Sequence, residues 1–289
     1  MRVSVTMVAS GRAEGTIGVV ELARAVEERG LDGLWFPDHT HIPVSRETPY
    51  PLGGELPDRY LRLIDPVAAL AMAAAATTRI RLGTGILLVA QRDPIVTAKA
   101  LATIDDQAGG RVVVGIGAGW NVDEMRDHGV DPATRFGRMR EHALAMRSIW
   151  QDDVSSFDGK HVQLAPSWSW PKPAQHPLPV LIGGAARLST FRHVAEYGQG
   201  WIPVGAHGLA DAVPQLRDQV AAAGRDPEVL EIVPFLGGLP SPEKLDGLGR
   251  LGATEVAIDI PPSDASTVLS ALDQVAESAE RSELRQSTR

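Results

Sequence analysis

The 289-residue sequence contains no cysteine, which excludes disulfide bonds and thiol catalysis. It also lacks a long apolar run, because its longest, residues 67–76, is too short to cross a bilayer. The net charge of −8 argues against nucleic acid or an anionic membrane as the main partner. The first eight residues are too short and too alternating for a signal peptide. We therefore expect a soluble cytoplasmic protein.

Common catalytic motifs are missing as well. There is no G-x-S-x-G turn, no Walker turn and no paired-cysteine motif, so no nucleophile is evident. The chain is nevertheless 44% hydrophobic and 22% charged, as expected for a globular protein with a large core. This pattern favours a protein that binds a cofactor carrying the chemistry.

Segments with strand character alternate with segments of helical periodicity. The pairs Asp65-Pro66, Asp93-Pro94, Asp131-Pro132 and Ser241-Pro242 are typical helix starts, with a capping side chain and proline at the first helical position. Strands are expected over residues 3–8, 33–36, 80–87, 112–114, 180–182, 200–204, 231–236 and 255–260. Eight strands alternating with eight helices predict an α/β fold, a (β/α)8 TIM barrel, with an open doubly wound sheet as the alternative.

Two segments interrupt this alternation. The proline- and glycine-rich loop over residues 40–64, after the second strand, is too long for a plain connection, so it is either a lid or a disordered insertion. Residues 154–165 alternate around Asp158-Gly159 and predict a hairpin before the fifth strand. We expect a single domain over residues 1–280 and a polar tail over 281–289.

The stretch from Arg111 to Trp120 reads as a buried strand that runs into a glycine turn. Glycines at 115, 117 and 119 allow a bound group to approach the backbone closely. The spacing is G-x-G-x-G, which differs from the dinucleotide fingerprint, so the turn is either a ligand site or a tight strand–helix connection.

Pro37-Asp38-His39-Thr40-His41 follows the second strand, at the end where barrels place their active sites. His39 can donate or accept a proton, and Asp38 can orient it; the alternative is a surface loop. His39 and His41 also suggest a metal-hydrolase pair that Asp259 and His207 could complete. We favour the reading without a metal.

A second glycine turn, Gly183-Gly184-Ala185-Ala186-Arg187, separates the fifth strand from its helix. Free N–H groups at a helix start beside Arg187 predict an anion pocket, which favours phosphate binding over a tight junction.

Taken together, these motifs resemble the bacterial-luciferase-like oxidoreductases, and within them the branch that uses the deazaflavin coenzyme F420. The matching pieces cover roughly residues 1–205. They are the run from Gly33 to His39, the run from Arg79 to Ile86, the run from Gly109 to Asn121, and Val180-Leu181-Ile182-Gly183-Gly184.

The resemblance implies a barrel with an insertion, often a homodimer, and a flavin-type ring at the carboxyl ends of the strands. His39 matches the family histidine near the reactive part of the ring, and Gly85-Ile86 falls where the family carries a non-prolyl cis peptide. The cofactor-binding residues it implies are Thr84, Gly85, Ile86, Gly117, Ala118, Gly119, Trp120, Gly183, Gly184 and Ala185.

There is one departure from the family pattern. Trp120 stands where some F420-dependent sugar-phosphate dehydrogenases have a glutamate that donates a proton, which argues against that substrate class. An arginine near Ala118 and a Glu-Ser pair near Gly183, present in the luciferase subunits, are also missing. These absences favour F420 over FMN.

We therefore expect an F420-dependent oxidoreductase that transfers a hydride to or from a small organic substrate, with His39 and Asp38 as catalytic residues. The alternatives are an FMNH2-dependent monooxygenase, a metal-dependent hydrolase using His39, His41 and Asp259, and a cofactor-binding protein without turnover.

Overall fold

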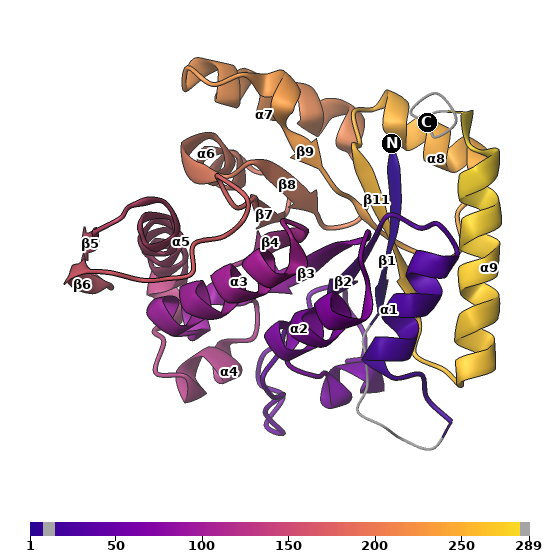
Figure 1. Cartoon of the computed structure of the whole chain (residues 1–289), viewed down its shortest axis with the longest axis horizontal. Coiled ribbons are helices and arrows are strands. Elements are labelled where there is room, and N and C mark those ends of the chain that lie inside the picture. Colours follow the sequence, from indigo (N-terminus) through magenta and orange to yellow (C-terminus); the bar gives the residue numbers. More distant parts are fainter. Residues whose placement is uncertain (8–14, 284–289) are drawn as a thin grey trace.

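A curled parallel sheet surrounded by helices forms the body of the molecule in the computed structural model, which describes residues 1–7 and 15–283 (Figure 1). Its strands are β1 (Arg2–Met7), β2 (Gly33–Phe36), β3 (Arg81–Leu87), β4 (Val112–Ile116), β7 (Val180–Gly184), β8 (Gly200–Pro203), β9 (Glu231–Ile232), β10 (Phe235–Gly237) and β11 (Glu255–Ile260). Their order is β10-β11-β1-β2-β3-β4-β7-β8-β9, and each neighbouring pair runs parallel.

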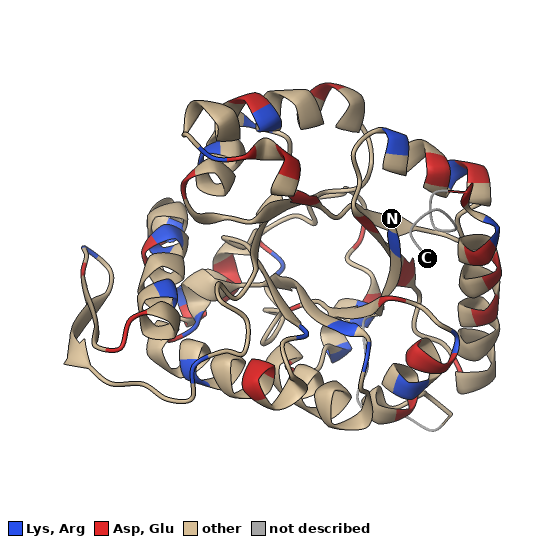
Figure 2. Cartoon of the chain, turned by 45° about the horizontal axis from the view of Figure 1, so that its top comes forward, with Lys and Arg blue, Asp and Glu red and all other residues tan. Residues whose placement is uncertain are grey.

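The sheet closes into a barrel through β9 and β10, which together occupy the place of one strand between β8 and β11. Between them, the Val233 N–H donates to Trp201 O at 2.9 Å, and Pro234 O accepts from the Ala257 N–H at 3.1 Å. The segment is therefore bonded to β8 on one side and β11 on the other, and Figure 2 shows the resulting ring. This confirms the expected (β/α)8 barrel. The strand expected over 231–236 is interrupted because Pro234 has no N–H to donate.

Helices cover the outside of the ring, and many of the charged residues lie on them (Figure 2). Those described are α1 (Val19–Glu28), α2 (Pro66–Ala76), α3 (Pro94–Ala108), α4 (Val122–Asp127), α5 (Arg135–Gln151), α6 (Leu188–Tyr197), α7 (Leu209–Ala222), α8 (Pro242–Arg250) and α9 (Ala265–Arg281). In the part of the chain that the structure describes, no helix combines the length and apolar character needed to span a membrane.

The helix starts follow the expected caps at three places. Side-chain oxygens of Asp65, Asp93 and Ser241 accept N–H groups of the first turns of α2, α3 and α8. Asp131-Pro132 instead begins a short 3-10 helix, and the long helix α5 starts after it. The sequence did not predict α4.

The structure contains both segments that were expected to interrupt the alternation of strands and helices. β5 (Ser155–Asp158) and β6 (Gln163–Ser167) pair antiparallel, which confirms the hairpin, and Figure 1 shows it projecting from the barrel. The insertion over residues 40–64 contains one 3-10 helix, Asp58–Arg62. Val8, the expected end of the first strand, and residues 284–289 of the expected tail lie outside the described residues.

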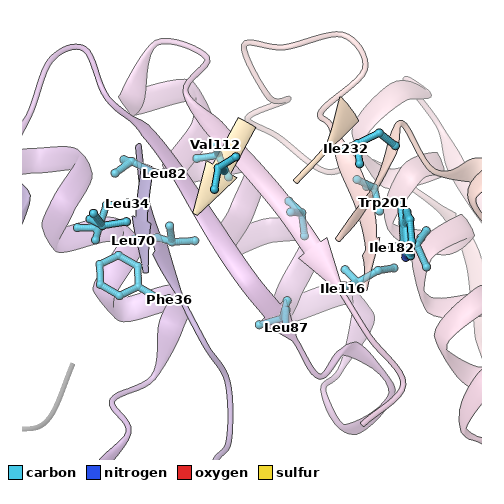
Figure 3. Close-up of a cluster of buried hydrophobic side chains, with 14 of the residues drawn as sticks. Leu34, Phe36, Leu70, Leu82, Leu87, Val112, Ile116, Ile182, Trp201 and Ile232 are labelled. Atoms are coloured by element: carbon cyan, nitrogen blue, oxygen red, sulfur yellow. The ribbon is translucent and has the colours of Figure 1, made fainter. Parts of the chain in front are cut away.

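Strand side chains alternate between two apolar layers. Leu34 and Phe36 of β2 pack outward in the cluster shown in Figure 3, beneath the helices. The intervening Trp35 points into the barrel, where it packs with Val113, Leu181 and other inward residues. The unbroken apolar runs of the strands follow from burial on both faces.

A buried glutamate, Glu255, ties several strands together at the amino-terminal end of the barrel. Its Oε1 accepts from Ser4 Oγ at 2.6 Å and from Trp35 Nε1 at 2.8 Å. Its Oε2 accepts from Arg2 Nε at 2.9 Å and from Arg81 Nη1. Burial by itself raises the pKa of Glu255, but Arg81 and Arg2 outweigh that effect and hold the pKa below its usual range.

We predict that Glu255→Gln lowers the free energy of unfolding by about 3–5 kcal/mol, because it leaves the partly buried Arg2 and Arg81 short of a charge partner. The folded-state pKa is depressed, so this stabilisation is present above the ordinary value of 4.5 and is lost as pH falls through the folded-state pKa. Urea unfolding followed by circular dichroism at neutral and acidic pH measures both effects. The exposed Glu277→Gln is the control, and equal stability of the two variants would contradict the role of Glu255.

Candidate active site

The carboxyl ends of the barrel strands surround a cavity of about 530 Å³. Four residues of the expected cofactor set line it: Gly85, Ile86, Gly183 and Gly184. The other lining residues are Thr6, Pro37, Leu52, Arg59, Tyr60, Ile202, Pro203, Val204, Gly205, Phe235, Leu236, Gly237 and Asp259. The cavity therefore combines strand ends with part of the insertion.

Ile86 organises one wall of this cavity. The Gly85-Ile86 peptide is cis, as expected, and the pairing of β3 with β4 shifts in register between Thr84 and Leu87. A Cβ on Gly117 or on Gly183 would overlap the Ile86 side chain. Glycine at these two positions thus leaves room for the Ile86 side chain between the ends of the strands. This packing role does not depend on a ligand.

The remaining residues of the expected cofactor set lie in different surroundings. Thr84 is fully buried, and its hydroxyl donates to Gly115 O at 2.8 Å, so it links β3 to β4. Ala118 is buried and Ala185 is exposed. Gly119 has a φ of +81°, a conformation that suits glycine. Their contact with a cofactor stays a prediction.

His39 is buried between two partners. Its Nδ1 lies 2.6 Å from Glu124 Oε2, and Trp120 Nε1 donates to its Nε2 at 3.2 Å. An indole N–H only donates, so Nε2 carries the lone pair and Nδ1 carries the hydrogen that Glu124 accepts. The structure therefore fixes the orientation of the ring and leaves Nε2 as the atom that can take up a proton.

The expected role of Asp38 as the partner of His39 is wrong. Asp38 Oδ2 accepts from Arg92 Nε and from the Leu88 N–H, both at 2.9 Å, and Oδ1 accepts from Arg92 Nη2 at 2.7 Å. Successive residues point in different directions along an extended segment, so Asp38 faces the segment before α3 while His39 faces α4. Asp38 holds the strand end in place through Arg92.

Glu124 is the residue that the sequence interpretation missed. It lies in α4, which Asn121 caps by accepting the N–H groups of Asp123 and Glu124. Glu124 is fully buried, and its Oε1 also accepts the Thr40 N–H at 3.1 Å. A sequence signal existed, because Asn121 three residues before Glu124 is a capping pattern.

The insertion reaches across the mouth of the cavity. Arg59 Nη1 is 2.7 Å from Asp259 Oδ2 at the end of β11. Tyr60 packs its ring edge-on against His39, and its hydroxyl lies 3.2 Å from that of Tyr50. Burial, and then the hydrogen bond with Tyr50, raise the pKa of Tyr60, so it stays a neutral phenol. In this structure, the insertion packs over His39 and forms part of the cavity wall.

These contacts also correct the metal-hydrolase alternative. It needs His39, His41 and Asp259 to converge, but Asp259 is paired with Arg59 and His39 with Glu124. The second ring nitrogen of His41 faces Asp127 at the surface. The three residues therefore do not form one metal site.

The comparisons with known proteins agree with this geometry. The family model of the luciferase-like monooxygenases matches residues 3–238. The chain belongs to this family. It is therefore an enzyme of the oxidoreductase type, as the sequence motifs predicted.

Among relatives of this luciferase-like enzyme, an uncharacterized protein of Mycobacterium tuberculosis is 41% identical over 88% of this chain and 91% of its own length. An F420-dependent glucose-6-phosphate dehydrogenase of Kineococcus radiotolerans is 29% identical over 72% of this chain, which spans 59% of that enzyme. An F420-dependent secondary alcohol dehydrogenase, solved with an F420-acetone adduct, shares the fold with a TM-score of 0.77 and 17% identity, covering 98% of this chain and 99% of that one.

We predict that Glu124→Ala in this luciferase-like enzyme lowers the free energy of unfolding by about 1–3 kcal/mol, because the buried Nδ1–H of His39 is left without an acceptor. The N–H of the exposed Thr40 loses the same acceptor but can bond to water. Nitrogen NMR of the imidazole should show one neutral tautomer in the wild type and a mixture in the variant. Asp127→Ala, an exposed change at the end of the same helix, is the control; a single unchanged tautomer in Glu124→Ala would contradict the assignment.

Proposed function

We propose that this luciferase-like enzyme is an F420-dependent oxidoreductase that transfers a hydride between the deazaflavin and a small organic substrate. The observation that carries the proposal is a histidine of fixed tautomer, His39, which packs against Tyr60 in the wall of a glycine-rich cavity at the carboxyl ends of the strands. The F420-dependent relatives support the choice of cofactor.

The residues present suit a flat cofactor. The cavity volume of about 530 Å³ is in the usual range for small-molecule sites. Five of its lining residues are glycines, which leave backbone N–H and C=O groups open to a ligand: Gly85, Gly183, Gly184, Gly205 and Gly237. Ile86, which packs against Gly117 and Gly183, offers an apolar surface for a ring. The glycine turn after β7 is where we place the phosphate.

When bound, F420 supplies the hydride chemistry. The chain's own groups then position the substrate and handle the proton. Glu124 keeps the hydrogen on Nδ1 of His39, so Nε2 is the atom that exchanges a proton with the substrate once Trp120 moves off it. Tyr60 and Tyr50, held over His39 by the Arg59–Asp259 pair, exclude water.

An FMNH2-dependent monooxygenase on the same barrel is the alternative. We do not propose glucose 6-phosphate as the substrate. Some F420-dependent sugar-phosphate dehydrogenases carry a proton-donating glutamate at the position of Trp120, and this chain lacks it. We also propose, from the resemblance alone, that the enzyme is a homodimer.

Titration of the purified protein with F420 and with FMN tests the cofactor. We expect micromolar binding of F420 and far weaker binding of FMN, followed by fluorescence or heat. The reverse preference would replace the proposal with the FMN monooxygenase, and binding of neither would reject both.

We predict that His39→Ala lowers kcat by about 10²- to 10⁴-fold, the usual contribution of a general acid or base, and leaves the Kd for F420 nearly unchanged. Steady-state kinetics and the same titration give the two values. His176→Ala, an exposed histidine before β7, is the matched control. Turnover unaffected by loss of His39 would remove it from the mechanism.

A further inference from the structure

Three potential metal ligands meet on the outer side of Glu124. Atoms of His41, His128 and Glu124 lie within 4.8 Å of one another. His41 comes from the start of the insertion, and Glu124 and His128 are four residues apart at the end of α4. Residues at this spacing share one face of a helix, so the cluster joins the insertion to α4.

The hydroxyl of Thr40 lies at the centre of this cluster. Its Oγ1 is 2.9 Å from His41 Nδ1, 2.6 Å from His128 Nε2 and 3.4 Å from Glu124 Oε1. A hydroxyl carries one hydrogen, so it satisfies one acceptor at a time. Thr40 can therefore donate to only one of these three atoms, while its own oxygen can accept from a ring nitrogen that carries a hydrogen.

The other nitrogen of His41 shows which lone pair faces the cluster. His41 Nε2 lies 2.9 Å from Asp127 Oδ2, and an ionised carboxylate only accepts, so Nε2 carries the hydrogen. In the neutral ring, Nδ1 then carries the lone pair, and it lies on the side of Thr40 and the cluster. A carboxylate behind a ligating imidazole is the usual arrangement around a protein-bound metal.

We propose that His41, His128 and Glu124 form a binding site for a divalent transition metal, with Zn²⁺ as the ion best suited to two imidazoles and a carboxylate. Zinc–nitrogen bonds of about 2.0–2.1 Å require the three side chains to draw closer by rotation. His41 is exposed and free to do so. The Thr40 hydroxyl or a water takes the fourth position.

The proposed metal site is linked to His39 by the carboxylate of Glu124. Glu124 Oε1 faces the cluster while Glu124 Oε2 accepts from His39 Nδ1 at 2.6 Å. A cation on Oε1 withdraws charge from the oxygen that holds His39, and it fastens the insertion to α4. Resting on the proposed function, bound zinc therefore changes the hydrogen bond by which Glu124 holds His39.

Titration of the metal-free full chain with Co²⁺, followed by visible absorption, tests the site without cofactor or substrate. We expect one equivalent to bind, Zn²⁺ to displace it, and His41→Ala and His128→Ala each to weaken binding by at least about tenfold. His176→Ala should bind as the wild type does. Absence of cobalt bands in the wild type, or unchanged affinity in both ligand variants, overturns the proposal.

Nitrogen NMR of His39 tests the coupling in the same cofactor-free protein. Zn²⁺ should shift the Nδ1–H signal in the wild type and leave it in place in His128→Ala. If the Nδ1–H signal of His39 does not move while the metal binds, the proposed coupling through Glu124 is wrong. Because neither readout needs turnover, failure of the F420 proposal would not alter either result.

Discussion

The barrel depends on a charged residue that is buried inside it. Glu255 lies at the amino-terminal end of β11, where it accepts hydrogen bonds from residues of β1, β2 and β3. Glu231 of β9 joins through the same two arginines, Arg2 and Arg81. The low dielectric of the interior makes these pairs strong and makes their loss costly. Strands far apart in the sequence are thereby held in one register.

A second buried carboxylate, Glu124, has a different role at the carboxyl-terminal end of the barrel. Glu124 is as buried as Glu255, but its two oxygens accept from His39 and Thr40 and have no arginine among the contacts described. Glu255 fixes strands, whereas Glu124 fixes the orientation and tautomer of one side chain. The stable end of the barrel and the end that we propose to be reactive are thus separated, as is usual for this fold.

The insertion connects the candidate active site to the surface. Tyr60 covers His39 from one side, Arg59 spans to β11, and His41 faces α4. The same segment thus lines the cavity and borders the surroundings of Glu124. The surface cluster and His39 therefore share the carboxylate of Glu124 and lie against the same insertion.

The sequence by itself determined the barrel. Apolar runs of β-branched residues gave strands buried on both faces, and the Asp-Pro and Ser-Pro pairs placed three helix starts, because these signals act over a few neighbouring residues. The hairpin around Asp158-Gly159 and the position of Gly85-Ile86 at the strand ends followed from similar local patterns and from the resemblance.

Only the tertiary structure decided which carboxylate meets His39. Asp38 is its neighbour in the chain, and Glu124 is 85 positions away. Proximity in sequence favoured the wrong residue, because adjacent residues of an extended segment point in different directions. The cluster around Thr40 likewise depends on packing between distant segments. Local patterns specify elements, whereas closure of the barrel specifies which side chains face one another.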